Sequence, residues 1–214
     1  MGFDHETVPA VDHTGSDHGE HAHPDGGDGL NRMAASATLH CLTGCAIGEI
    51  AGLIIGTAAG LSNFTTVVVS IALAFVFGYS LSSLPLLKAG LAAGAVAGVV
   101  LASDTLSIAI MEIVDNLTVL VVPGAMDAGL TDPTFWWSMM LALTIAYAAA
   151  YPLNRFLLAR GKGHAVTHQA YDTAPDTMPT WRHRVPAPSP EALAAAITTF
   201  MLGGLLVAAA AAMA

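Results

Sequence analysis

The sequence predicts an all-α integral membrane protein, a bundle of four core transmembrane helices with a fifth span at the C-terminus. Hydrophobic residues make up 54% of the chain, charged residues 11%, and the mean hydropathy is +0.62, values far from those of a soluble domain. A helix needs about 20 apolar residues to cross the hydrocarbon of a lipid bilayer. Five stretches approach or exceed that length, at approximately 36–61, 64–84, 89–122, 134–159 and 191–213.

The first 32 residues form an acidic tail with almost no apolar side chains. They carry seven of the sixteen Asp and Glu residues, and such a composition predicts disorder. Because the chain has only seven Lys and Arg beside these acids, nucleic acid is not an expected partner. The tail is either a solubilising segment or an accessory metal-binding tract, for which the candidates are His5, His13, His18, His21 and His23.

The first apolar stretch has a glycine at every fourth position. Residues four apart share one face of a helix, and small residues let two membrane helices approach closely. This face therefore predicts tight packing, either within one chain or in a homo-oligomer or larger membrane assembly. Its members are Gly44, Gly48, Gly52, Gly56 and Gly60.

A second ladder in the same stretch consists of Cys41, Cys45 and Glu49, with His40 beside its first member. Thiolates at positions i and i+4 can reach one soft cation, as paired histidines do in helical zinc sites. The spacing and the expected cytoplasmic-side position favour reduced thiols over a disulfide. The expected site binds Cu(I) or Zn(II) through both cysteines and His40, with Met111 as a thioether ligand. Inert packing of the cysteines is the alternative, and no organic cofactor is expected.

The third stretch carries a polar stripe. Spacings of three, four and one place these residues on one side of a helix, where they face protein or water and not lipid: Asp104, Ser107, Met111, Glu112, Asp115 and Asn116. Glu49 and Glu112 both fall near mid-depth, so we expect one shared buried site in which at least one carboxyl is protonated or metal-bound. The candidates for an ion or proton relay are Glu49, Asp104, Glu112, Asp115 and Asn116.

The number of crossings in 89–122 decides the topology. One crossing puts every Lys and Arg on one side of the membrane, whereas two would put Lys88 opposite Arg155. Positively charged loops stay cytoplasmic, which favours one crossing and a cytoplasmic N-terminus. The resulting division is a tail at 1–32, a four-span domain at 33–163, a cytoplasmic Pro-rich linker at 164–190 and a transmembrane helix at 191–214.

Interfacial residues frame the fourth stretch. Trp136 and Trp137 stand where an aromatic belt is expected, and Arg155 suits an anchor on acidic lipid headgroups. Pro152 lacks a backbone donor and predicts a kink, with Asn154 placed to satisfy the backbone groups that the kink frees.

Five motifs resemble a bacterial and archaeal membrane family known as domain of unknown function 4396. They are HCLTGCAIGE at 40–49, MEIVDN at 111–116, PGAMDAGL at 123–130, YPLNR at 151–155 and RGKGH at 160–164. The resemblance covers about residues 35–165 and implies a compact helical membrane domain in the plasma membrane of a prokaryote. It brings no established activity, and the acidic tail and the last span lie outside it.

Two functions are compatible with these patterns. The first is the handling or transport of a soft metal ion, Cu(I) or Zn(II), through intramembrane Cys, His and carboxylate side chains. The second is a structural or accessory subunit that assembles through its glycine faces without transport. No nucleophile motif, phosphate loop or zinc-protease signature occurs in the sequence, so an enzyme is not expected.

Overall fold

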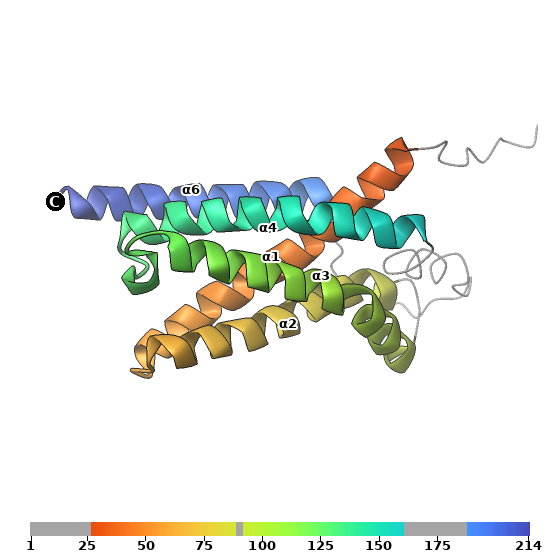
Figure 1. The fold of residues 1–214 in the computed structure, drawn as a ribbon, viewed down its shortest axis with the longest axis horizontal. Coiled ribbons are helices and arrows are strands. Elements are labelled where there is room, and N and C mark those ends of the chain that lie inside the picture. Colours follow the sequence, from red (N-terminus) through yellow and green to blue (C-terminus); the bar gives the residue numbers. More distant parts are fainter. Residues whose placement is uncertain (1–26, 89–91, 161–187) are drawn as a thin grey trace, which may run out of the picture.

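The computed structural model describes residues 27–88, 92–160 and 188–214, and nearly all of them lie in five long helices (Figure 1). No strand occurs in these ranges, which confirms the all-α prediction. Each long helix has the length and apolar composition needed to cross a membrane, so the chain is an integral membrane protein. The helices are α1 (Asp28–Ala58), α2 (Asn63–Lys88), α3 (Ala93–Val121), α4 (Pro133–Ala159) and α6 (Pro190–Ala212), with a short 3-10 helix η1 (Ala125–Asp127) before α4.

The helix limits depart from the hydropathy limits because polar caps and polar end turns define them. α1 starts at Asp28, so the last residues assigned to the tail form its first turn. Asp132 caps α4 by accepting a hydrogen bond of 2.8 Å from the Thr134 backbone N–H, the arrangement that short polar side chains provide at helix starts. Ser189 caps α6 in the same way. The expected tail histidines and most of the linker lie outside the described residues.

α1 is the central helix, because it packs against α2, α3, α4 and α6. Its glycine face lies directly on α2, so that a Cβ atom on any of four glycines would overlap with α2 atoms. The close pairs are Gly44 with Gly78, Gly48 with Ala74, Gly52 with Ser70 and Gly56 with Thr66. Gly60 lies outside this contact and instead adopts a positive φ of 63° just beyond the end of the helix. The glycine face is thus occupied within the chain.

Two long-range hydrogen bonds mark the opposite ends of the bundle. Arg155 Nε donates to Asn31 Oδ1 over 2.6 Å and joins the end of α4 to the start of α1. Asn63 Nδ2 donates to Asp127 Oδ1 over 3.2 Å and joins the start of α2 to η1. Successive helices therefore alternate in direction, and α3 is one helix between the two ends.

The basic residues gather at one of these ends, where Asp28 and Glu191 also lie. Every Lys and Arg in the described ranges lies at one end, called here the basic end: Arg32, Lys88, Arg155 and Arg160. The other end is called the acidic end. In the connections described there, the charged residues are Asp127 and Asp132.

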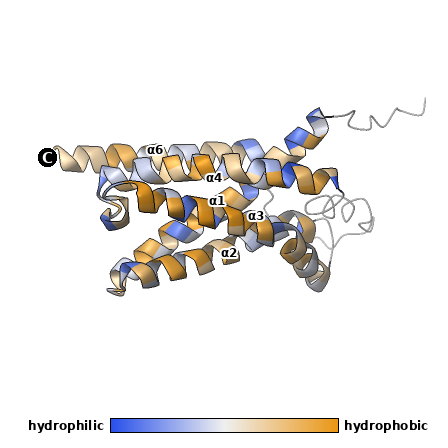
Figure 2. Cartoon of the chain, viewed as in Figure 1, coloured by the Kyte–Doolittle hydropathy of each residue, from blue (hydrophilic) through white to orange (hydrophobic). Residues whose placement is uncertain are grey.

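Apolar side chains cover the outside of the bundle. Phe64, Leu120 and Leu206 are among the exposed large hydrophobic residues, and Figure 2 shows predominantly hydrophobic helix faces with hydrophilic residues at the helix ends and at a few positions between them. This distribution suits a surface that faces lipid chains. In Figure 1 the first turns of α3 run at an angle to the rest of that helix, and they pack on the end of α2 through Leu86, Val96 and Val100.

Candidate functional site

Buried polar side chains follow the facing sides of α1 and α3. In α1 they recur at spacings of three and four, which keeps them on one helix face. In α3 the spacings are one, three, five and three, and the members lie on one broader side of the helix. None is more than 7% exposed. We call this set the polar column: Thr38, Cys41, Cys45 and Glu49 from α1, and Ser103, Asp104, Ser107, Glu112 and Asp115 from α3.

Three carboxyl groups lie near one another in the polar column. Glu49 on α1 is close enough to Asp115 and Glu112 on α3 for their charges to interact. Neither oxygen of Glu49 or Glu112, nor Oδ1 of Asp115, accepts a hydrogen bond from a donor in the described part of the chain. Because an ionised carboxylate has no proton to donate, a Glu49–Asp115 hydrogen bond needs a proton on one of the two.

This carboxyl cluster, Glu49, Glu112 and Asp115, is chemically unsatisfied when fully ionised. Like charges close together in a medium of low dielectric disfavour one another, and burial disfavours each charge separately. A carboxylate within a bilayer costs on the order of 3 kcal/mol on insertion scales. The cluster therefore favours the uptake of a proton or another cation.

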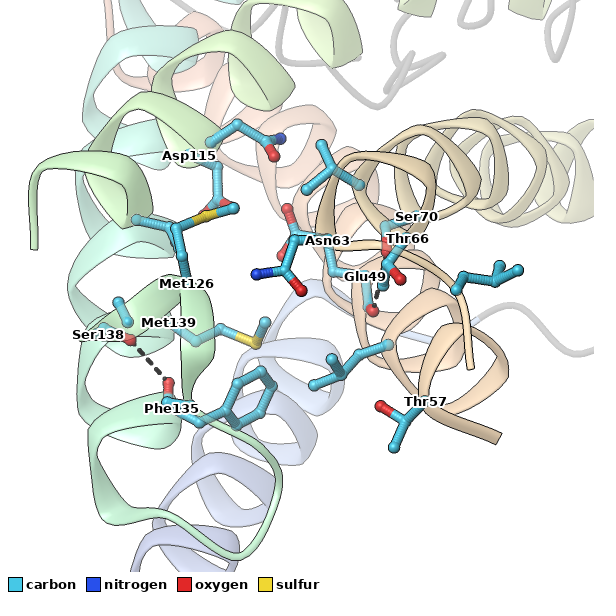
Figure 3. Close-up of a pocket in the computed structure, with 17 residues that line it drawn as sticks. Glu49, Thr57, Asn63, Thr66, Ser70, Asp115, Met126, Phe135, Ser138 and Met139 are labelled. Carbon is cyan, nitrogen blue, oxygen red and sulfur yellow. Dashed lines mark hydrogen bonds between the residues drawn. The ribbon is translucent and has the colours of Figure 1, made fainter. Parts of the chain in front are cut away.

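A cavity of about 160 Å³ leads from the acidic end to two of these carboxyl groups, those of Glu49 and Asp115. Its rim contains Thr57, Leu61 and Asn63, which are exposed, while Glu49 and Asp115 form part of its wall. Figure 3 shows Glu49 and Asp115 on opposite sides of the cavity, projecting from α1 and α3. Further lining atoms come from polar and thioether side chains of Ser70, Asn116, Met126, Ser138 and Met139.

The two thiols lie between the carboxyl cluster and the basic end. Both cysteines are free and buried. The Cys45 thiol lies beside Glu112, and Cys41 lies next to the hydroxyl groups of Ser107 and Ser82. Met111 is buried in the same apolar cluster as the cysteines. The thiols thus adjoin the carboxyl groups within the polar column.

His40 forms a hydrogen bond within its own helix. Its Nδ1 lies 2.9 Å from the Ser36 carbonyl oxygen, and since a carbonyl only accepts, Nδ1 is the donor in this bond. Consecutive residues of a helix point about 100° apart, which separates His40 from Cys41. In the ranges that the structure describes, no three His, Cys, Asp or Glu side chains converge in an arrangement suited to a metal ion.

Asn154 joins three helices on the basic-end side of the thiols. Its Nδ2 donates to Thr38 Oγ1 over 2.9 Å and to Ser107 Oγ over 3.0 Å, linking α4 with α1 and α3. Thr38 donates in turn to the Ala34 carbonyl, and Ser103 donates to Asp104. We call Asn154, Thr38 and Ser107 the Asn154 junction. The expected role of Asn154 near Pro152 was local, whereas its amide nitrogen bonds side chains of two other helices.

Some residues of the site were predicted from the sequence and others were not. Asn116 was expected in the relay. Its Nδ2 donates to the Glu112 backbone oxygen over 2.9 Å, and it lines the cavity. Ser82 and Met139 were not expected at the site, because nothing in the sequence distinguishes them from their neighbours Ser83 and Met140. Only the rotation of α2 and α4 about their axes brings these two side chains into the bundle interior.

The whole site lies within the part of the chain that matches a protein family. Residues 30–163 match the family model described as Domain of unknown function (DUF4396). This range is more than half of the chain and contains both the polar column and the Asn154 junction. Comparison with curated proteins found no match, and comparison with solved structures found none either.

Proposed function

The chain belongs to this family of unknown function, and we propose that it handles or transports a cation in the membrane along its polar column. The cation is a proton or a soft metal ion, Cu(I) or Zn(II). One observation supports this proposal above the others: Glu49, Glu112 and Asp115 lie near one another in the bundle interior, with carboxyl oxygens that no described donor satisfies.

A purely structural role would leave a different pattern around these acids. A carboxyl group that only locks helices together is stabilised by completing its hydrogen bonds, as the amide of Asn154 does. Unsatisfied buried polar groups cost about 1–3 kcal/mol each. Five such oxygens in one cluster therefore favour a site that is filled by a proton or a cation from outside the chain.

The thiols extend the proposal to soft metals. Cu(I) and Zn(II) prefer thiolate ligands, and Cu(I) also accepts thioethers. Cys41 and Cys45 adjoin the carboxyl cluster, and Met111 packs in the same region. A metal ion held first by carboxylate oxygen can pass to sulfur without leaving the column.

The direction of the bundle in the membrane follows from the basic end. Lys and Arg near helix ends favour the cytoplasmic side, so we place the basic end and the N-terminus in the cytoplasm, at the plasma membrane of a prokaryote. The carboxyl cluster then lies between a cavity on the outer side and thiols on the inner side.

Transport by the full-length protein in proteoliposomes tests the relay. Glu49→Gln, Glu112→Gln and Asp115→Asn each keep the shape of the side chain but remove its negative charge. We expect proton or metal flux to fall to the level of empty liposomes in at least the Glu49 variant. Exposed Asp132→Asn at the same end serves as the matched carboxyl control and should retain flux. Full flux in all three cluster variants would instead support the accessory-subunit function.

Metal content separates the two cations. Full-length protein loaded under reducing conditions should retain about one Cu(I) or Zn(II) more than the Cys41→Ser/Cys45→Ser double variant, because two thiolates are a sufficient start for a soft site. Measuring the difference between two full-length chains removes any contribution of the tail histidines. Equal metal content in both would leave the proton as the cation and packing as the role of the cysteines.

A further inference from the structure

The two sides of the carboxyl cluster differ in access. Toward the acidic end, the cavity joins Glu49 and Asp115 to the exposed rim at Thr57, Leu61 and Asn63. Toward the basic end, Thr38, Ser107 and Asp104 are each 0% exposed and Asn154 is 2% exposed. The column is open on one side and closed on the other.

Glu49 itself indicates that the cavity takes a ligand. Its side chain is 7% exposed, it lines the cavity, and both its carboxyl oxygens lack a hydrogen bond from any described donor. A cavity with several polar partners is a place for water and small ions, whereas an apolar cavity of the same size stays dry. Around Glu49 those partners are Ser70, Asp115, Asn116 and Ser138.

The closed side depends on the Asn154 junction. The two hydrogen bonds from the Asn154 amide hold α4 against α1 and α3 at the level where Thr38 and Ser107 are buried. Pro152 lies two residues earlier in α4 and removes one backbone donor from the helix. This part of α4 can therefore bend at low cost once the junction opens.

We propose that the cavity is the aqueous entrance through which a small cation reaches Glu49 and Asp115 from the acidic end, and that the Asn154 junction closes the opposite exit in this conformation. The inference deepens the proposed function, on which it rests for the identity of the ligand as a cation. Access, however, is measurable without transport, so the two can fail separately.

Thiol labelling in oriented vesicles tests the entrance. The full-length chain has two cysteines, and Cys41→Ala/Cys45→Ala gives a cysteine-free background. Thr57→Cys at the rim and Ser70→Cys deeper in the cavity are then treated with membrane-impermeant methanethiosulfonate reagents, one cationic and one anionic. We expect both positions to react only from the acidic end. The cationic reagent should react about tenfold faster or more at Ser70→Cys, since an acidic cleft concentrates cations.

Matched variants isolate the charge of the cluster. Glu49→Gln with Asp115→Asn should remove the cationic preference at Ser70→Cys. Thr65→Cys, which is exposed at the same end but outside the cavity lining, should react equally with and without the two carboxyl groups. Three results would overturn the proposed entrance. They are labelling of Ser70→Cys from the basic end, equal rates with both reagents, and no reaction at all.

A second arm tests the exit with a native reporter. In a Cys45→Ala background, Cys41 should resist the cationic reagent added at the basic end, and Asn154→Ala or Thr38→Val should raise its labelling severalfold. Thr144→Val is the control, because this α4 hydroxyl donates to the Met140 carbonyl of its own helix and lies outside the cavity lining. Cys41 that stays protected in a folded Asn154→Ala protein would overturn the closed exit.

The ligand is assigned by protection. A bound metal ion should slow labelling of Ser70→Cys but not of Thr65→Cys when Zn(II) or Cu(I) is added, whereas a proton-binding cluster should respond to pH alone. Correct labelling in a protein without flux would remove the proposed transport and leave the entrance intact. Flux in a protein that is labelled from the basic end would remove the entrance and leave the proposed transport intact.

Discussion

Two faces of α1, offset by one residue, meet their neighbours in opposite ways. The face of Gly44, Gly48, Gly52 and Gly56 lies so close to α2 that none of these positions has room for a Cβ. The next face, from Thr38 to Glu49, meets α3 through polar atoms, several of which lack a partner in the described chain. Close contact maximises dispersion and leaves no room for water, whereas unsatisfied polar atoms cost stability. The glycine face therefore holds the fold, and the polar column is retained for its chemistry.

The largest expected effect comes from filling the glycine face. Gly48→Leu places a side chain where the Ala74 backbone lies, so the two helices must separate. We expect a loss of at least about 3 kcal/mol, at the upper end of overpacking penalties, measured as lost thermal stability or yield in detergent. Gly94→Ala is the control, because open space surrounds that glycine and alanine favours a helix by about 1 kcal/mol. If Gly48→Leu were as stable as wild type, the contrast between the faces would fail.

Removing the Asn154 junction should have the next largest effect. Asn154→Ala deletes two buried hydrogen bonds between helices and should cost about 1–3 kcal/mol. Thermal unfolding measures the loss, and Asn116→Ala, which removes a bond within α3 alone, provides the comparison. Equal losses in the two variants would show that linking three helices adds nothing to the bond itself.

Replacing an acid of the carboxyl cluster should leave stability nearly unchanged and abolish cation flux. Glu49→Gln replaces an acid that accepts no hydrogen bond in the described chain with a neutral side chain of the same shape. The free energy of unfolding should change by less than about 1 kcal/mol while cation flux is lost. A Glu49→Gln protein that unfolds readily would show that Glu49 is needed to hold the fold.

The smallest effect on stability is expected at the thiols. Cys45→Ser changes one small side chain for another and gives Glu112, its neighbour, a stronger hydrogen-bond donor. Stability should stay within about 1 kcal/mol of wild type, with metal retention as the sensitive measurement. Loss of folding in this variant, with Cys41→Ser unaffected, would assign Cys45 to packing.

The sequence predicts the fold class because hydrophobicity and length decide whether a helix crosses a membrane. It also predicts that Glu49, Cys45 and Cys41 share a face, and that Glu112 and Asp115 lie on one side of α3, because both statements depend on spacing within one helix. That the carboxyl groups of α1 and α3 share one site stays a prediction, and the structure places Glu49 near Asp115 and Glu112.

Features that depend on how helices rotate against each other escape the sequence. Asn154 reaches Thr38 from a helix more than a hundred residues away. This contact does not follow from spacing within one helix, because packing of the whole bundle sets each helix's orientation.

The tight contact between α1 and α2 bears on how the chain is made. During synthesis these two helices, joined by a short turn at 59–62, emerge before α3, so Glu49 meets lipid before Asp115 and Glu112 exist. Its insertion alone costs on the order of 3 kcal/mol in the charged form. The glycine contacts allow α1 to enter together with apolar α2 as a hairpin, which offsets that cost until α3 arrives and covers the acid. The glycine face of α1 thus helps the polar face of the same helix to enter the membrane.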